Sequence, residues 1–220
     1  MGIYNLYGTV AYLCHRIKQD TMIENIVFDL GGVVIGRDYE HFGAEIKEFA
    51  FLQGDRPFPE YWKRYDRGTA SRDEVANAVA AENGLTIPEA LHKLDRLVEL
   101  FNVFECTARL ISQLSEAGYN LYVLSNMPVD FYNAVSRFDV FRHFKGQVIS
   151  SREGIAKPDP RIFALLTERY GISPDSTLFV DDKPSNTSAA ASLGFATYTF
   201  TPCEESCDGI RTMLGLPCRK

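Results

Sequence analysis

Four short polar clusters contain the residues of this sequence whose types and spacing could do chemistry. The first is Asp29, which follows the apolar run 25–28 and precedes Gly31 and Gly32. A carboxylate in this position can act as a nucleophile, and glycines beside it let the backbone approach an anion closely. A helix cap or a turn would explain one such match equally well. The later clusters therefore decide how the first one is interpreted.

Two of the later clusters carry groups that suit phosphate. Ser125 and Asn126 follow a second apolar run and offer a hydroxyl and an amide, ahead of a helix that begins near Pro128. Amides at a helix start and a hydroxyl bind phosphate oxygens well. Lys157 precedes a helix that begins with proline, and its charge could neutralise a phosphoryl group or a nucleophilic carboxylate.

The fourth cluster indicates a metal ion. Asp181 and Asp182 end another apolar run, and Asn186 lies in the next turn. Adjacent carboxylates suit Mg²⁺, which takes one or two protein carboxylates together with substrate phosphate oxygens. Capping or surface charge would explain each cluster taken singly. It does not explain four clusters in succession, each at the carboxyl end of a predicted strand, where one sheet would bring them together.

Strands and helices that alternate along the chain must position these clusters. Besides 25–28, the pattern predicts strands at 119–124, 147–149, 177–180 and 196–200. Between them it predicts helices over 107–117, after Pro128, from Pro158 to about Tyr170, over 185–193 and from Glu204. This order predicts an α/β fold with a Rossmann-like parallel sheet that is covered by helices on both faces.

A long insertion separates the first two clusters. Residues 36–105 intervene where a direct strand-to-helix connection takes about 2 to 6 residues. We therefore expect a helical cap domain over 36–105, inserted into a core domain made of 22–35 and 106–220. Apolar spacing near 3.6 predicts a helix over 39–52, and Ser71 with Glu74 forms a capping box at another helix start. A further amphipathic run extends from Pro88 to Phe101.

From about Ile26 to Asn186 the four ordered clusters make the chain resemble the haloacid dehalogenase superfamily of phosphohydrolases. The resemblance implies that Asp29 is the nucleophile that forms an aspartyl-phosphate. It implies that Ser125 and Asn126 bind the phosphate and that Lys157 binds it too and stabilises charge.

The same resemblance implies a magnesium site and its supports. Asp29, Asp182 and the backbone carbonyl of Gly31 would hold Mg²⁺. Asp181 would be a supporting acid that does not bind the metal directly, and Asn186 would orient its neighbours. The substrate would be a small phosphorylated metabolite.

One position departs from the superfamily pattern. Phosphatases of the superfamily usually carry a second aspartate two residues after the nucleophile, where this chain has Gly31. The usual general acid and base is therefore absent. A branch resembling bacterial α-glucose-1-phosphate phosphatases shares the Asp-Leu-Gly arrangement, and its leaving group, an anomeric hydroxyl, depends less on a general acid. We therefore expect a sugar phosphate such as a hexose 1-phosphate as the substrate.

The insertion would close over the active site and contact the leaving group. Candidate residues for this contact are Tyr61, Trp62, Arg64 and Tyr65, although a core position is the better expectation for Trp62. His41 is a candidate for the missing acid, but a lone histidine near a helix start is usually a surface or core residue. It is not assigned a role.

Two alternative functions stay open at this point. A haloacid dehalogenase uses the same carboxylate nucleophile and lysine without a metal, but it has no need for the pair Asp181 and Asp182. A catalytically weak phosphate-binding regulator would explain the loss of the second aspartate, but not why a nucleophile, a cation and a metal ligand are all present. A nucleotide-dependent dehydrogenase is disfavoured because no Gly-x-Gly-x-x-Gly follows the first strand.

Composition limits partners and compartment. The 220 residues carry a net charge of −6, with lysine and arginine scattered, so we expect no nucleic-acid partner. No apolar run reaches the roughly 18 residues of a membrane span. Five cysteines, an odd number, without zinc-site spacing favour free thiols, Cys203 and Cys207 included, and a cytoplasmic location. Residues 1–21 are interpreted as an N-terminal extension; a native start at Met22 is one hypothesis for it, and whether these residues are native stays open. The oligomeric state is not indicated.

Overall fold

A five-stranded parallel sheet forms the centre of the molecule. The computed structural model describes residues 22–54 and 57–218, so the expectations for residues 1–21 and for Cys14 lie outside the described residues. The strand order is β5-β4-β1-β6-β7, and every neighbouring pair is parallel. The strands are β1 (Asn25–Phe28), β4 (Asn120–Ser125), β5 (Gly146–Ile149), β6 (Thr177–Asp181) and β7 (Ala196–Thr199). The predicted α/β fold with a Rossmann-like sheet is confirmed.

The register of the central strands brings the polar clusters to one edge. Phe28, the last residue of β1, pairs with Val123 of β4 on one side and with Val180 of β6 on the other. Asp29 therefore leaves the sheet at the same level as the ends of both neighbouring strands. The carboxyl edge of an open parallel sheet is where ligands bind in α/β folds.

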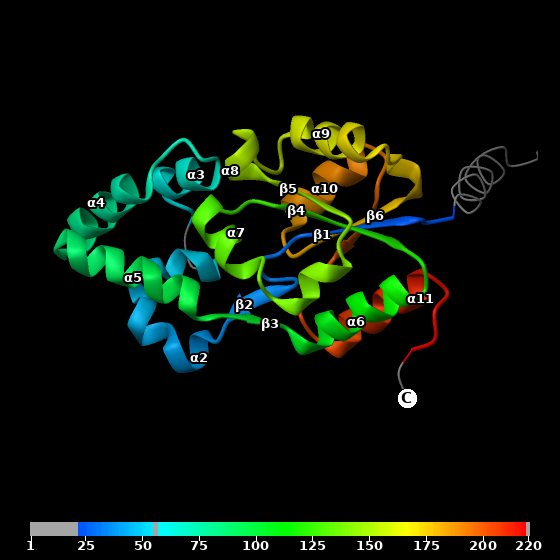
Figure 1. The fold of residues 1–220 in the computed structure, drawn as a ribbon, viewed down its shortest axis with the longest axis horizontal. Coiled ribbons are helices and arrows are strands. Elements are labelled where there is room, and N and C mark those ends of the chain that lie inside the picture. Colours follow the sequence, from blue (N-terminus) through cyan, green and yellow to red (C-terminus); the bar gives the residue numbers. More distant parts are fainter. Residues whose placement is uncertain (1–21, 55–56, 219–220) are drawn as a thin grey trace, which may run out of the picture.

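Helices cover both faces of the sheet (Figure 1). Alternate side chains of β1 point to opposite faces: Ile26 and Phe28 join the core that includes α6 and α11, whereas Val27 joins the core of α9 and α10. The helices and turns of this part are α6 (Glu105–Glu116), α7 (Val129–Val135), η2 (Asp139–His143), α8 (Ser150–Glu153), α9 (Pro160–Tyr170), η3 (Pro174–Ser176), α10 (Pro184–Ser192) and α11 (Glu204–Met213).

The long connection from β1 to β4 is helical and lies to one side of the sheet, on the left in Figure 1. It leaves and returns through a two-stranded antiparallel sheet of β2 (Ile35–Arg37) and β3 (Phe101–Val103). Between these strands lie α2 (Tyr39–Phe42), η1 (Gly43–Gln53), α3 (Glu60–Asp66), α4 (Arg72–Asn83) and α5 (Ile87–Glu99). The capping box predicted at Ser71 and Glu74 is present at the start of α4.

The helix predicted over 39–52 differs from the structure. A four-residue α-helix is followed there by the 3-10 helix η1, and Ile46 and Phe49 have backbone angles outside the helical region. Phe49 and Phe51 are both fully buried, and both rings contact Trp62. Residues two apart lie on opposite sides of an α-helix. The packing of both phenylalanine rings against Trp62 therefore explains why this segment is not a regular α-helix.

Two further sequence expectations concern the chain as a whole. In the part of the chain that the structure describes, no helix combines the length and apolar character that a membrane crossing requires. Cys106, Cys203, Cys207 and Cys218 are free thiols. Burial, with Cys106 nearby, raises the pKa of Cys207 to about 12, which keeps this thiol protonated and unreactive at neutral pH.

Candidate active site

Asp29 lies in the turn that follows β1 and is almost completely buried. Its backbone N–H donates to the carbonyl of Val180 at 2.9 Å, which fixes it against β6. Its Oδ1 accepts from the backbone N–H of Leu30 at 2.7 Å and lies 3.0 Å from Nζ of Lys157. Burial raises the pKa of Asp29; Lys157 opposes this shift and the charge of Asp181 adds to it. The carboxylate is thus poorly solvated and held by one cation.

The two glycines after Asp29 have different surroundings. Gly32 has a φ of +76°, and a Cβ there would lie 2.7 Å from Oδ2 of Asp182. Only glycine adopts this conformation readily and leaves that space. Gly31 has no positive φ, and a Cβ there would meet nothing within 4 Å. Gly32 therefore permits the close approach of Asp182, whereas Gly31 leaves open space.

Lys157 is the central cation of the site, and its side chain is fully buried. Its Nζ donates to Oδ2 of Asp181 at 2.6 Å and to the carbonyl of Leu124 at 2.7 Å, in addition to its contact with Asp29. Burial on its own lowers the pKa of Lys157, but the two carboxylates outweigh this, and the net shift is upward. Lys157 is therefore charged and connects three strand ends.

Ser125 and Asn126 lie beside Lys157. The side-chain oxygen of Asn126 accepts from the backbone N–H of Lys157 at 2.8 Å, and its NH₂ donates to the carbonyl of Lys157 at 2.9 Å. Asn126 thus holds the Lys157 backbone in place. The Ser125 hydroxyl is buried without a hydrogen-bond partner among the described residues. A buried hydroxyl left without a partner is costly, which is consistent with a ligand that is not present.

Asp29, Asp181 and Asp182 form an acidic cluster, with one oxygen of each within 4.8 Å of the others. The Asp181 carboxylate is fully engaged by Lys157, by the backbone N–H of Lys183 and by Asn186, whose NH₂ donates at 2.9 Å. Asp182 differs because its Oδ1 is buried without a partner in the described part of the chain. Burial, with Asp29 next, raises the pKa of Asp182 to about 6. A hard divalent cation between Asp29 and Asp182 would satisfy both groups.

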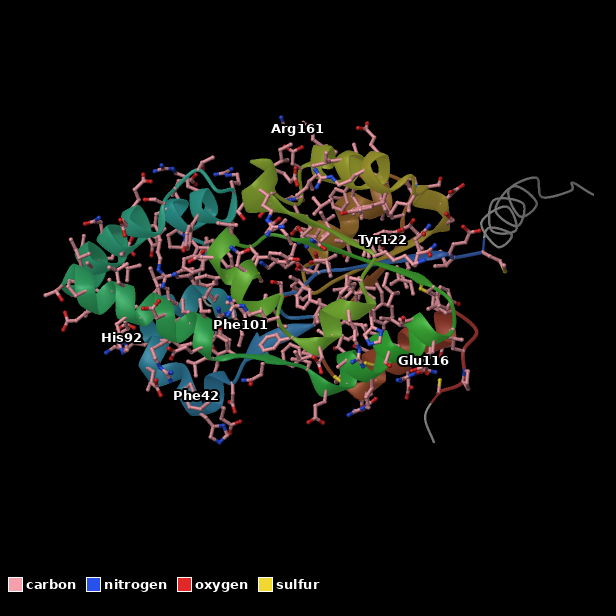
Figure 2. The ribbon with its side chains drawn as sticks, viewed as in Figure 1. Phe42, His92, Phe101, Glu116, Tyr122 and Arg161 are labelled. Atoms are coloured by element: carbon pink, nitrogen blue, oxygen red, sulfur yellow. The ribbon has the colours of Figure 1, made fainter. Side chains whose placement is uncertain are left out.

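A cavity of about 810 Å³ opens onto this cluster, within the size range of small-molecule sites. The core side provides Asp29, Lys157 and Asp182. Opposite groups come from the helical insertion and its strands, and they mix charged with aromatic side chains: Arg37, Tyr39, Phe58, Trp62, Lys63, Asp66, Arg67 and Phe101. Phe101, labelled in Figure 2, lies where the insertion meets the sheet. The cavity is therefore polar at the sheet edge and lined by both charged and aromatic side chains beyond it.

The structure separates the insertion residues that the sequence singled out. Trp62 lines the cavity, but it is also packed against several rings of the core, as expected. The Tyr61 hydroxyl contacts Glu82, Arg64 contacts Glu74, and Tyr65 donates to Asp130, so these three are engaged away from the cavity lining.

His41 has a side chain that is 72% exposed and pairs with Asp38. It does not line the cavity.

Three cavity residues escaped the sequence analysis. Asp66 is buried at the end of α3, four residues after Trp62 and hence on the same helix face. That spacing could have identified it. Arg37 lies with its guanidinium 3.7 Å from the centre of the Phe101 ring. Lys183 directly follows the acid pair at the end of β6, a position that could have identified it, and its Nζ lies 4.5 Å from the Phe58 ring centre. The position of Arg37 follows from no sequence pattern.

Residues 23–194 match the family model for haloacid dehalogenase-like hydrolases. The fold and the match define a hydrolase with a Rossmann-like parallel sheet, and the chain belongs to the haloacid dehalogenase-like hydrolase family. The chain is therefore a hydrolytic enzyme, and the proteins similar to it include both a phosphatase and a haloacid dehalogenase.

Similar proteins include both whole chains and parts of longer ones. Acyl-CoA dehydrogenase family member 10 of Mus musculus is 28% identical over 87% of this chain, which spans only 19% of that protein. D-ribitol-5-phosphate phosphatase of Bacteroides thetaiotaomicron is 26% identical over 80% of this chain and 91% of its own length. A HAD family enzyme of the same organism, solved as a magnesium complex, is 27% identical with a TM-score of 0.70, covering 86% of this chain and 98% of that one.

Proposed function

We propose that this protein is a magnesium-dependent phosphomonoester hydrolase that acts through an aspartyl-phosphate on Asp29. The observation that carries the proposal is the buried Asp29 carboxylate, which opens into a cavity while Lys157 and a second, unsatisfied carboxylate lie beside it. Phosphoryl transfer depends mainly on positioning and on charge stabilisation, and this arrangement provides both.

Asp29 would attack phosphorus with the oxygen that is free of other contacts. Oδ1 is held by Leu30 and Lys157, whereas Oδ2 has no hydrogen bond to any described residue. The bond from phosphorus to the leaving oxygen breaks as the bond to Asp29 forms. Water then attacks phosphorus, which releases inorganic phosphate and restores the carboxylate. A covalent intermediate divides one difficult hydrolysis into two easier steps.

The acidic cluster fits Mg²⁺ in type and in charge. Asp29 and Asp182 would hold the ion together with the carbonyl of Gly31, because these are the hard oxygen donors that Mg²⁺ prefers. When bound, Mg²⁺ would offset the negative charge of the phosphoryl oxygens. Asp181 stays a supporting acid because Lys157 and Asn186 already occupy its oxygens.

The remaining residues of the sheet edge would bind and position. Lys157 would offset charge on the transferring phosphoryl group. The Ser125 hydroxyl, which is buried without a partner, would donate to a phosphate oxygen. Asn126 would hold Lys157 through its two hydrogen bonds and complete the phosphate site.

We further propose that residues 36–105 are a cap domain on a core made of 22–35 and 106–220. The insertion supplies aromatic and charged groups to the cavity, opposite Asp29. Such a cap would exclude water and contact the leaving group. A sugar phosphate, such as a hexose 1-phosphate, fits both the mixed lining and the absence of an aspartate at Gly31. The similarity to a phosphatase named for D-ribitol 5-phosphate supports a polyol or sugar leaving group.

Product release from a substrate panel tests the proposal, measured as phosphate from the phosphate esters and as chloride from 2-chloropropionate. The panel is p-nitrophenyl phosphate, glucose 1-phosphate, glucose 6-phosphate and 2-chloropropionate, each with Mg²⁺ or with EDTA. The chain offers a matched control in Asp175→Asn, which alters an exposed aspartate of η3 that does not line the cavity. We expect turnover of the phosphates only with Mg²⁺, loss of about 10³-fold or more in Asp29→Asn, and no change in Asp175→Asn.

Other results would overturn the proposal in distinct ways. Metal-independent chloride release would identify a dehalogenase. Binding of phosphate without turnover of any substrate would identify a phosphate-binding protein. A preference for glucose 6-phosphate over glucose 1-phosphate would leave the chemistry intact and reject the hexose 1-phosphate assignment.

A further inference from the structure

Asp66 is a buried acid that the chemistry described so far does not use. It ends α3, is 8% exposed and lines the same cavity as Asp29. Its carboxyl group makes no hydrogen bond or ion pair with any residue that the structure describes. A buried carboxylate without a partner is costly, and the cost falls when the group is protonated. Asp66 is therefore an acid that faces the substrate space from the side opposite the sheet.

The backbone of Asp66 is fixed relative to Asp29. The Ser150 hydroxyl donates to the carbonyl of Asp66 and accepts from the backbone N–H of Met127 at 3.0 Å, which ties α3 to the loop after β4. Gly68, two residues later, packs on α8 so closely that a Cβ would lie 2.1 Å from the carbonyl oxygen of Ser151. Figure 1 shows α3 and α8 side by side. The acid is thus held by contacts to the core of the molecule, not only by the insertion.

Burial keeps the proton of Asp66 in place at neutral pH, although two neighbouring cations oppose it. Burial raises the pKa of Asp66 to about 8, and the negative charge of Asp29 adds to this shift. Lys183, at the start of α10, and Arg67, at the end of its own helix, oppose the shift. An acid whose pKa lies near the working pH is suited to give a proton and then take one back.

We propose that Asp66 is the general acid and base that the Asp-Leu-Gly sequence lacks, an inference that rests on the proposed phosphatase chemistry. In the first half-reaction the bond from Asp29 to phosphorus forms, the bond to the leaving oxygen breaks, and the Asp66 proton passes to that oxygen. In the second, the Asp66 carboxylate takes a proton from the attacking water while the bond from phosphorus to Asp29 breaks. Inorganic phosphate leaves, and both aspartates return to their starting state.

This assignment changes the expected substrate class. If no acid were present, the enzyme would be restricted to leaving groups as acidic as an anomeric hydroxyl. With Asp66 as the acid, phosphate esters of ordinary alcohols become substrates as well. The two explanations of Gly31 therefore predict different dependences on the leaving group.

A series of three leaving groups tests the assignment. The probes are D-ribitol 5-phosphate, glucose 1-phosphate and p-nitrophenyl phosphate, in order of increasing leaving-group acidity, with Mg²⁺ present. Asp66→Asn keeps the shape of the side chain, and Asp73→Asn alters an exposed aspartate of the insertion as the control. We expect Asp66→Asn to lose about 10²–10³-fold in kcat/KM, which reports the first half-reaction alone, on D-ribitol 5-phosphate, less on glucose 1-phosphate, and under about 3-fold on p-nitrophenyl phosphate.

The pH profile gives a second readout. Wild-type kcat/KM on D-ribitol 5-phosphate should fall on the alkaline side, and this fall should be absent in Asp66→Asn. An equal loss of kcat/KM on all three substrates, or no loss on any, would reject Asp66 as the acid while the proposed phosphatase stands. If wild type releases no phosphate even from p-nitrophenyl phosphate, the proposed function itself fails.

Discussion

At the scale of single residues, the neighbouring glycines after Asp29 provide a matched pair. We expect Gly32→Ala to lower Mg²⁺-dependent turnover at least tenfold and to weaken the apparent Mg²⁺ affinity. The added methyl would lie 2.7 Å from Oδ2 of Asp182 in a backbone with φ near +76°, so the carboxylate must move. Gly31→Ala should retain turnover within about 3-fold, because a methyl group there meets open space and the backbone carbonyl is kept. Phosphate release across a Mg²⁺ titration measures both.

Equal losses in the two glycine variants would contradict this account, because then the space at Gly32 would not be the cause.

Position 31 also allows a second experiment. Gly31→Asp places a carboxyl group where superfamily phosphatases usually carry one, in a backbone that accepts a side chain. Introduced into Asp66→Asn, this change tests with the same three substrates whether a carboxyl group at position 31 can act as the missing acid.

The core site residues could be predicted from the sequence because each lies at or beyond the carboxyl end of a strand, with the short helix α8 between β5 and Lys157. Asp29, Lys157 and Asp182 lie within one site because parallel strands end at one edge. Their chemical roles stay predictions. The spacing of Asp66 from Trp62 places it on the same face of α3, but its position in the cavity also depends on how α3 packs on α8, which no local pattern encodes.

At the scale of secondary-structure elements, two glycines that end helices make another matched pair. Gly68 follows α3 and Gly84 follows α4, and both have a left-handed backbone, with φ of +70° and +65°. We expect Gly84→Ala to cost about 1 kcal/mol of unfolding free energy, which reflects backbone strain alone. Gly68→Ala should cost at least about 2 kcal/mol more, because a Cβ there would lie 2.1 Å from a backbone oxygen of Ser151.

Urea unfolding of both variants measures this difference. Gly68→Ala should also displace Asp66, so its loss of turnover on D-ribitol 5-phosphate should exceed its loss on p-nitrophenyl phosphate. Equal unfolding free energies for the two variants would show that the contact between α3 and α8 shifts to accept the added methyl group at little cost.

The regular strands and helices of the core were predictable because each is long enough to show its periodicity. The strands β2 and β3 were missed because three residues are too few for an alternating pattern. In η1 the pattern of apolar residues suited an α-helix, but the burial of Phe49 and Phe51 against Trp62 prevailed. Shortness thus hid the two strands, and tertiary packing decided the winding of η1.

At the scale of the whole molecule, buried acids make stability depend on pH in a way that Mg²⁺ should reverse. The pKa of Asp182 is raised to about 6 and that of Asp66 to about 8, from 3.8. The folded protein therefore binds more protons than the unfolded chain above pH 4, and its stability falls as pH rises through this range. In EDTA we expect the free energy of unfolding to fall between pH 5 and 8, by up to about 1.4 kcal/mol per pH unit for each group.

Carboxylates with lowered pKa, such as Asp159 and Glu89, add stability that is already complete at pH 5 and does not mask the trend. Urea unfolding at pH 5 and pH 8 measures the fall, and Asp66→Asn combined with Asp182→Asn should reduce it. Added Mg²⁺ should restore wild-type stability at pH 8, by about 2.7 kcal/mol at a hundredfold excess over its dissociation constant. Stability that rises from pH 5 to pH 8 in EDTA would contradict the assignment of these buried acids.

The antiparallel pairing of β2 with β3 has a consequence for how this enzyme could be diversified. Arg37 and Phe101 are partners in register, so the chain enters the helical insertion and returns from it at adjacent points. A different segment could therefore replace the insertion between these two residues while the strands β1 and β4 keep their places in the sheet. The pair of β2 and β3 is therefore a junction at which chimeras could be made, and exchange of the proposed cap there should change the substrate preference while the sheet edge is kept.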